Sequence, residues 1–377
     1  MLKTSFMIDP SRRLPAKDGH FAPELAGTIR EYVGRLGERV SWARLAEIPG
    51  EPLAAGRIRR ITDRVRLAAA ADRAFLRPSS RHAAELAALE REDRVAAAVF
   101  RLACLCEPSD ESLVTELLSA PLRDRAVDCG VLYRDRAGLR ASITLAPCRG
   151  RVYVADARGH AGRGDHPVYL GETTAQELDY CLPRLPLARR GRALEIGSGT
   201  GLVVLELSGC YEQWDGGEYD PRAVAFSRLN ASLHGAPNVR FFQSDLFSGA
   251  SGRYDLILFN PWQPSEDSVE LIERFLREAP DHLEPDGECV LLIESGEVGG
   301  RNEVVERIAA ALRANGCSAE RQIRSAYVRG GEPPVLGVTS VLRIRRDPRQ
   351  PGSIRTRSDL GALRAVVRRG VLRIAGR

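Results

Sequence analysis

Apolar side chains recur every three or four positions through the first third of the chain, which is the spacing of amphipathic helices. The spacing predicts helices over residues 21–45, 58–75, 81–106, 109–118 and 122–129. Ser80 is placed to cap the third of these helices, which is expected to be interrupted near residues 91–93. A hairpin over residues 130–145 is expected next. Because helices account for most of the segments before it, the N-terminal part of the chain is predicted to be mostly helical.

Beyond residue 190 the pattern changes to short apolar runs that alternate with amphipathic segments. Strands are expected at residues 192–196, 239–243, 254–259, 289–293 and 335–344, with another ending at Glu218, and helices at residues 202–207, 222–233 and 269–278. Strands that alternate with helices form a parallel sheet covered on both faces. The predicted fold class is α/β, a Rossmann-like domain preceded by a mostly helical domain.

The first of these strands runs directly into three glycines at alternate positions. The stretch is Glu195, Ile196, Gly197, Ser198, Gly199, Thr200 and Gly201, and an apolar helix follows at once. Glycine allows a sharp strand-to-helix turn and lets a ligand lie against bare backbone. The acid inside the strand end argues against a pyrophosphate, because phosphates favour the unopposed N–H groups of a helix start. A cationic ligand fits better, and S-adenosylmethionine, with its sulfonium and ammonium groups, meets that description.

Polar residues also close the next three strands. Glu218 and Tyr219 end the second strand, where an acid can accept hydrogen bonds from both ribose hydroxyls. The third strand leads to Ser244, Asp245, Leu246 and Phe247, and the fourth leads to Asn260, Pro261 and Trp262.

With these four motifs in order, residues 166–345 resemble a class I S-adenosylmethionine-dependent methyltransferase. The motifs are similar to those of the Asn-Pro-Pro-aromatic amino-methyltransferases, which include release-factor glutamine N5-methyltransferases and RNA N-methyltransferases. The resemblance implies that the cofactor contacts Glu195, Gly197, Ser198, Gly199, Gly201, Glu218, Tyr219, Asp245, Leu246 and Asn260. Thr173 and Thr174, in a segment before the first strand, are expected either to bind the cofactor carboxylate or only to cap a helix.

Asn260 and the carbonyl of Pro261 would, by the same resemblance, accept hydrogen bonds from the target amine. Two acceptors aimed at its N–H bonds turn the nitrogen lone pair toward the methyl group. Here Trp262 and Gln263 replace the second proline and the aromatic residue of the family pattern. Trp262 is therefore expected to act in catalysis beside Asn260 and Pro261. The acceptor is left open among amines, guanidines, amides and oxygen nucleophiles.

Composition limits the other possibilities. The chain has 377 residues, no apolar run long enough to span a membrane and no secretory leader pattern at its start. Its eight cysteines are scattered without metal-ligand spacing, so no metal site is expected and a cytoplasmic location is predicted. The net charge is +5, but residues 345–377 contain ten arginines and two aspartates, which is +8, so the remaining residues carry 5 − 8 = −3. This tail is either a solvated segment or an RNA-binding one.

The predicted domains are residues 1–130, a β connector at 131–165, the methyltransferase domain at 166–345 and the tail at 346–377. Helices and a hairpin over residues 95–145 resemble a winged helix, as in a group of actinobacterial methyltransferase-like proteins. Asp124 and Asp128 lie on its second helix, where they would face phosphates unfavourably. The resemblance therefore implies a substrate lid or a homodimer surface more than a reader of nucleic acid.

Three functions are compatible with these features. The expected one is N-methylation of a small molecule or amino acid, of the kind found in natural-product biosynthesis, with no membrane partner. The alternatives are N-methylation of ribosomal RNA or of a translation protein at glutamine N5, and a cofactor-binding homologue that transfers no methyl group. The acidic catalytic half favours the first function, whereas the basic tail favours an RNA partner.

Overall fold

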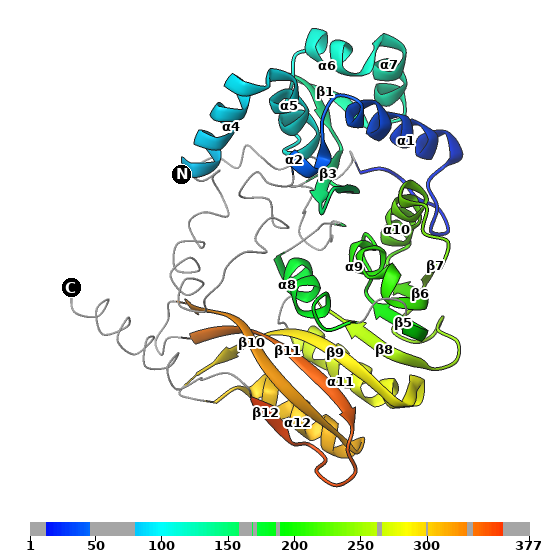
Figure 1. Ribbon diagram of the computed structural model, residues 1–377, viewed down its shortest axis with the longest axis vertical. Coiled ribbons are helices and arrows are strands. Elements are labelled where there is room, and N and C mark those ends of the chain that lie inside the picture. Colours follow the sequence, from blue (N-terminus) through cyan, green and yellow to red (C-terminus); the bar gives the residue numbers. More distant parts are fainter. Residues whose placement is uncertain are drawn as a thin grey trace, which may run out of the picture.

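The computed structural model describes residues 13–45, 80–157, 168, 172–185, 189–261, 266–298, 301–329 and 335–356. The expected helix at residues 58–75 lies outside these ranges, as does most of the predicted tail. Figure 1 shows a mostly helical N-terminal part, a large mixed sheet and helices on both faces of that sheet. Among the described helices, none is long and apolar enough to cross a membrane.

The N-terminal helices follow the predicted order, with breaks that have local causes. They are α1 (Pro23–Gly37), α2 (Trp42–Leu45), α4 (Ser80–Glu92), α5 (Arg94–Val99), the π-helix η2 (Phe100–Cys104), α6 (Glu111–Leu118) and α7 (Ala120–Asp128). The predicted interruption occurs at Asp93, whose carboxylate accepts a hydrogen bond from the N–H of Ala96, 2.9 Å away, and caps α5. The helix expected over residues 21–45 is divided, since α1 ends at Gly37 and α2 starts at Trp42. The Trp42 ring packs closely on Gly37, where a Cβ would be 3.0 Å from Nε1.

Two hairpins follow the helices. The first pairs β1 (Leu132–Asp135) with β2 (Gly138–Ala141), and the second pairs β3 (Ile143–Cys148) with β4 (Arg151–Asp156). The expected succession of two helices and a hairpin is therefore present, and the winged-helix resemblance stays a prediction.

The main sheet has eight strands in the order β12-β10-β11-β9-β8-β5-β6-β7. Its strands are β5 (Arg189–Ile196), β6 (Tyr211–Glu218), β7 (Val239–Gln243), β8 (Tyr254–Phe259), β9 (Leu283–Glu297), β10 (Cys317–Arg329), β11 (Val335–Arg346) and β12 (Ile354–Thr356). The five strands from β7 to β9 are parallel, as predicted, whereas β11 runs antiparallel to both β9 and β10. No described helix lies between β10 and β11, so the alternation that predicts parallel pairing fails there.

Side chains alternate across the sheet and build two apolar layers. Leu194, Ile257 and Leu291 face one layer, which contains the buried sides of α11 (Glu266–His282) and α12 (Glu303–Ala314). Ala193 and Leu258 face the other, against α8 (Glu172–Cys181) and α9 (Leu202–Glu206). This period of two is the reason why the central strands are apolar on both faces. The Rossmann-like fold class is confirmed.

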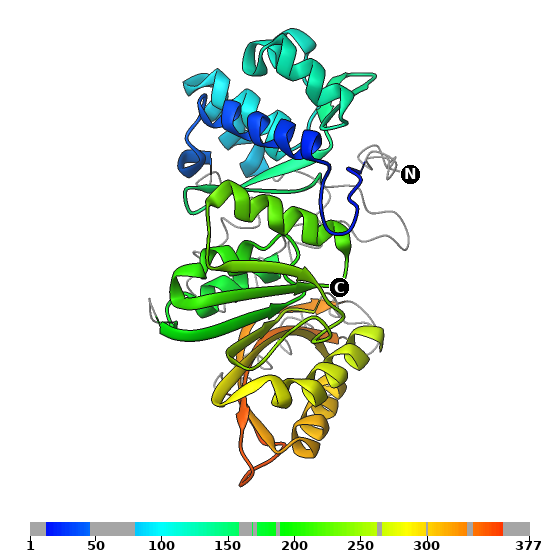
Figure 2. The ribbon, with the colours of Figure 1, turned by 90° about the vertical axis from the view of Figure 1, so that its right-hand side faces the viewer.

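Helix α10 (Pro221–His234) joins the sheet to the N-terminal part, and Figure 2 shows it between the two. Phe226 of α10 meets Phe21 edge to face, with 4.9 Å between the ring centroids. Arg222 forms an ion pair with the buried Asp156 of β4 at 2.6 Å. The buried Asn230 amide exchanges two hydrogen bonds with Val154 of β4 and donates a third to the carbonyl of Thr200. The N-terminal part is thus tied to the glycine loop through α10.

The sheet continues past the expected domain end at residue 345. Ile354 and Thr356 of β12 pair with Ala319 and Arg321 of β10 in parallel register. The turn before β12 packs closely on α12, because a Cβ on Gly352 would lie 2.8 Å from the carbonyl oxygen of Ala309. Residues 347–356 therefore belong to the same folded unit as the sheet.

Candidate active site

The candidate site lies at the carboxyl ends of β5, β6 and β8. The strand order reverses between β5 and β8, since β6 and β7 lie on one side of β5 and β8 and β9 on the other. In open α/β sheets such a reversal leaves a crevice outside the strand ends, and ligands bind there. All four motifs identified from the sequence end at this edge.

The glycines of the loop after β5 have different structural roles. Gly197, Gly199 and Gly201 have φ values of +71°, +52° and +77°, a region that side chains other than glycine rarely adopt. A Cβ on Gly201 would lie 2.5 Å from the Phe241 ring, so this glycine allows close packing. A Cβ on Gly199 would meet no described atom within 4 Å, so this glycine leaves the loop open on one side.

Glu218 is held beside that open side by two backbone donors. Its Oε2 accepts a hydrogen bond from the N–H of Gly199 at 2.9 Å, and its Oε1 accepts one from Asp220 at 3.1 Å. Burial raises the pKa of the carboxyl, and the backbone hydrogen bonds oppose that rise. The neighbouring Tyr219 side chain is 72% exposed, which is unusual for an aromatic ring and leaves its face free for a planar group.

The loop after β7 holds the other two residues expected to contact the cofactor. The Ser244 hydroxyl donates to the carbonyl of Leu246 at 2.6 Å, and Leu246 itself is buried at a φ of +46°. The Asp245 carboxylate is half-exposed and forms an ion pair with Arg274 of α11 at 2.7 Å. The sequence alone did not identify Arg274, because this residue and its partner Asp245 lie on different elements of the chain.

The central part of the site is rich in buried oxygen atoms. Glu195 of β5 accepts a backbone hydrogen bond from Val204, but its Oε2 is buried and has no partner within the described ranges. Burial and then the negative charges of Glu177 and Glu218 raise the pKa of Glu195 well above its usual range. The Ser198 hydroxyl is likewise buried and unpartnered among the described residues. Within the described ranges, these unpartnered oxygen atoms therefore have neither a hydrogen-bond donor nor a cation beside them.

Glu177 of α8 belongs to this group, although sequence reasoning missed it. Its side chain is fully buried, its Oε2 accepts a hydrogen bond from Asn260 Nδ2 at 3.1 Å, and its Oε1 has no partner in the described part of the chain. Burial raises its pKa to about 7, against the lowering effect of Asn260. The available signal was its place on the apolar side of α8, four residues before the buried Cys181.

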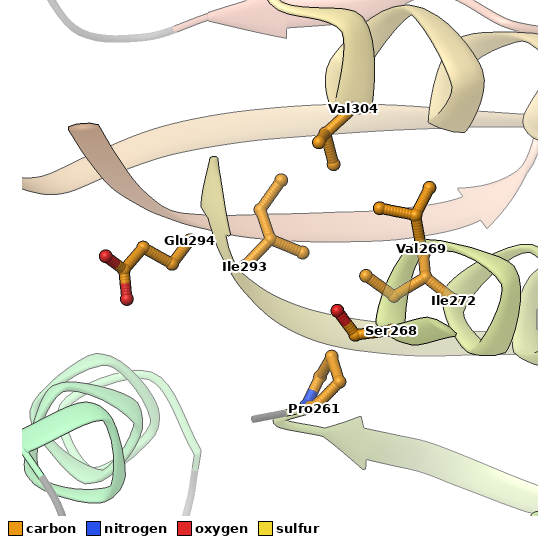
Figure 3. A pocket seen from close by; sticks show the side chains of 7 residues that line it. All are labelled: Pro261, Ser268, Val269, Ile272, Ile293, Glu294 and Val304. Atoms are coloured by element: carbon orange, nitrogen blue, oxygen red, sulfur yellow. The ribbon is translucent and has the colours of Figure 1, made fainter. Parts of the chain in front are cut away.

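The remaining predicted residues are only partly described. Thr174 is half-buried on α8, whereas the Thr173 side chain and the whole of Trp262 lie outside the described residues. Pro261 borders a small recess beyond Asn260, lined also by Ser268, Val269, Ile272, Ile293, Glu294 and Val304. Figure 3 shows the aliphatic side chains converging there while the Glu294 carboxylate points away from them. Within the described ranges, no group of three or more His, Cys, Asp or Glu is placed to hold a metal ion.

Comparison with known proteins agrees with this geometry. Residues 176–308 match the family described as the methyltransferase small domain. This segment is a class I methyltransferase domain. The predicted cofactor of the domain, S-adenosylmethionine, is thereby confirmed. The site fits that ligand, because its positively charged ammonium group would supply the partner that the buried Oε2 of Glu195 lacks among the described residues.

Three curated relatives illustrate the range of similar proteins. The methyltransferase domain is similar to a putative protein N5-glutamine methyltransferase of Methanocaldococcus jannaschii, with 31% identity over 30% of this chain and 66% of the relative. A ribosomal protein uL3 glutamine methyltransferase of Xanthomonas campestris shows 32% identity over 28% of this chain and 42% of the relative. The ribosomal RNA small subunit methyltransferase C of Chromohalobacter salexigens shows 34% identity over 45% of this chain and 51% of the relative. The chain thus spans between two fifths and two thirds of these relatives.

Proposed function

We propose that the protein is an S-adenosylmethionine-dependent N-methyltransferase whose acceptor is the side-chain amide of a glutamine in another protein. The observation that carries the proposal is the buried Oδ1 of Asn260, after the end of β8, which has no hydrogen-bond partner in the part of the chain that the structure describes. An acceptor oxygen held there, together with the main-chain carbonyl of Pro261, suits a nitrogen that carries two N–H bonds.

The residues of the site have separate tasks in this reaction. S-adenosylmethionine supplies an activated methyl group when bound. Glu218 and the backbone at Gly199 hold its ribose side, and Glu195 holds its ammonium. Asn260 Oδ1 and the Pro261 carbonyl accept the two N–H bonds of the incoming amide, which turns the nitrogen lone pair toward the methyl group and stabilises the positive charge that develops. The nitrogen then loses one proton to solvent.

Two further features support glutamine as the acceptor. Two of the three relatives described above are named for glutamine methylation. The small recess beside Pro261 has aliphatic walls from Val269, Ile272 and Ile293, so the surroundings of the fork suit an uncharged amide nitrogen better than a charged one. The initial expectation of a small-molecule acceptor has no counterpart among these relatives and stays a prediction.

Ribosomal RNA is the second candidate acceptor. One relative is named for it, and residues 345–377 carry a charge of +8, which would neutralise phosphates. The altered Trp262 and Gln263 positions argue against it, because the family pattern places there an aromatic residue that stacks on a base.

Methyl-tritiated S-adenosylmethionine distinguishes the two acceptors. The purified protein would be incubated with bacterial ribosomes, with purified ribosomal RNA and with a release factor in separate reactions, followed by protease or ribonuclease. Under the proposal, the label is lost with protease and resists ribonuclease, and mass spectrometry places the methyl group on a glutamine. Label in RNA alone favours the second candidate, and label in neither fraction contradicts both. The Asn260→Ala protein is the control for transfer by this site.

A further inference from the structure

Glu177 and Asn260 form a direct link between α8 and the end of β8. Asn260 Nδ2 donates to Glu177 Oε2 at 3.1 Å across 83 positions of sequence. The remaining polar atom of each group, Glu177 Oε1 and Asn260 Oδ1, is buried and unpartnered among the described residues. The Glu177 side chain has no exposed surface, so the link lies inside the protein.

The link matters because the two ends of an asparagine amide have opposite hydrogen-bonding properties. The NH2 end only donates and the oxygen only accepts, so just one orientation of Asn260 presents an acceptor to a target amide. An ionised carboxylate only accepts, so it must take the NH2 end and leaves Oδ1 facing the acceptor. A protonated carboxyl can donate its O–H to Oδ1, and the NH2 end then faces the acceptor with the wrong polarity.

We propose that Glu177 is a positioning residue that sets the orientation of the Asn260 amide, and that the site is competent for methyl transfer only when Glu177 is ionised. The proposal rests on the proposed function for its consequence in catalysis, but the link itself is independent of that function. It assigns no contact between Glu177 and the acceptor.

The surroundings of Glu177 place its ionisation near neutral pH. Burial raises the pKa of Glu177 to about 7, while the hydrogen bond from Asn260 lowers it. Glu195 of β5 lies near it, and burial, followed by the negative charges of Glu177 and Glu218, raises the pKa of Glu195 itself. Cys181 on the same helix interacts electrostatically with Glu177, Glu195, Arg184 and Cys210 of η3 (Ser208–Cys210), and burial raises the pKa of both thiols, so both are neutral. A cofactor cation beside Glu195 would favour the ionised form.

The link is tested without any acceptor by NMR of the full-length protein labelled with 15N-asparagine. The chain has only five asparagines, Asn230, Asn238, Asn260, Asn302 and Asn315, so the side-chain amide of Asn260 is assigned by its loss in Asn260→Ser. The expected result is that its 15N and 1H shifts titrate with a midpoint near 7, which falls on addition of S-adenosylmethionine. Glu177→Gln abolishes the titration.

Glu206→Gln is the matched control for this measurement. Glu206, at the end of α9, has a carboxylate that accepts a hydrogen bond from the Tyr153 hydroxyl and forms an ion pair with Arg149, and it makes no contact with Asn260. The control protein keeps the Asn260 titration. If the Asn260 amide does not titrate between pH 5.5 and 9, or titrates identically in Glu177→Gln, the proposal is overturned.

A second readout concerns catalysis with the protein acceptor that labels best. In wild type, the single-turnover rate rises about tenfold from one pH unit below the midpoint of the loaded enzyme to its plateau. In Glu177→Gln the profile is flat and the plateau about fivefold lower, with cofactor affinity retained, since a neutral amide holds Asn260 less firmly than a carboxylate. A merely structural role would lower stability and leave the pH profile unchanged, which contradicts the proposal. If Asn260→Ala loses methyl transfer but the pH profile of Glu177→Gln equals that of wild type, only the role of Glu177 is refuted. If the NMR link is intact but no acceptor is methylated, only the proposed function is refuted.

Discussion

Glu218 Oε2 accepts a hydrogen bond from the backbone N–H of Gly199 at 2.9 Å, which joins the end of β6 to the open part of the glycine loop. The second oxygen of the carboxylate is held by the N–H of Asp220 at 3.1 Å. Each carboxylate oxygen can accept more than one hydrogen bond, so Glu218 is oriented before a ligand binds and still has capacity for two hydroxyl groups. The carboxylate that we propose as the ribose ligand is therefore preorganised.

The first prediction concerns this carboxylate. Glu218→Ala should weaken binding of S-adenosylmethionine by about 10- to 150-fold, because a charge-assisted acceptor is worth about 1.5–3 kcal/mol. Glu218→Gln, which keeps one oxygen for the ribose, should lose less. Isothermal titration calorimetry measures both, with thermal unfolding as the control for folding. Wild-type affinity in the alanine variant would show that Glu218 does not contact the cofactor.

The second prediction separates the glycines of the loop. Gly199→Ala should fold with a penalty of about 1–2 kcal/mol from its positive φ, yet lose cofactor binding, since its methyl group enters the space left open for the ligand. Gly201→Ala should mainly destabilise the fold, because its Cβ would collide with Phe241. The melting temperature should therefore fall further in Gly201→Ala, whereas the affinity measured by calorimetry should fall further in Gly199→Ala. Equal loss of stability in both variants argues against a ligand role for Gly199.

The third prediction concerns the nitrogen acceptor. Asn260→Ala should retain cofactor affinity and lower the single-turnover rate of methyl transfer by about 10²–10³-fold, the loss of one preorganised hydrogen-bonding group. Rapid-quench measurements at saturating cofactor test this directly. Full activity in the variant would leave a methyltransferase that does not use the Asn260 fork.

The fourth prediction is a pH dependence of stability from Glu177. Its carboxyl binds a proton more tightly in the folded protein, with a pKa of about 7, than in the unfolded chain, where the value is 4.5. The resulting stability is present below pH 4.5 and is lost as the pH rises through 7, by a free energy on the order of 3 kcal/mol. Glu177→Gln should therefore lose less stability between pH 5 and 8 than wild type, by differential scanning fluorimetry without cofactor. An equal loss in both proteins contradicts the assignment.

The fifth prediction concerns the end of the sheet. A chain that ends at Arg346 lacks β12 and the turn that packs on α12, and should be about 1–3 kcal/mol less stable than the full chain. A chain that ends at Thr356 keeps the pairing of Ile354 with Ala319 and is the matched comparison. Urea unfolding measures the difference. Equal stability of the two truncations would mean that β12 adds nothing to the fold.

The sequence alone determined the elements whose signals are local. The predicted ranges of β7 and β8 agree with the structure residue for residue, and α10 ends before Gly235 as predicted, at a φ of +59°. The glycine loop was identified for the same reason, since its turn depends on residues that are adjacent in the chain. Hydrophobic periodicity, helix caps and glycine turns depend only on residues a few positions apart, so these elements can be predicted from a single sequence.

Only the tertiary structure decided which distant groups meet. The antiparallel β11, the added β12 and the ion pair of Arg274 with Asp245 depend on how segments pack, not on their own patterns. Glu177 is the clearest case, because an acid on a short helix is ordinarily solvated. Packing of α8 buries Glu177 and brings it to Asn260, and this burial raises its pKa, which a solvated carboxylate on the same helix would not show.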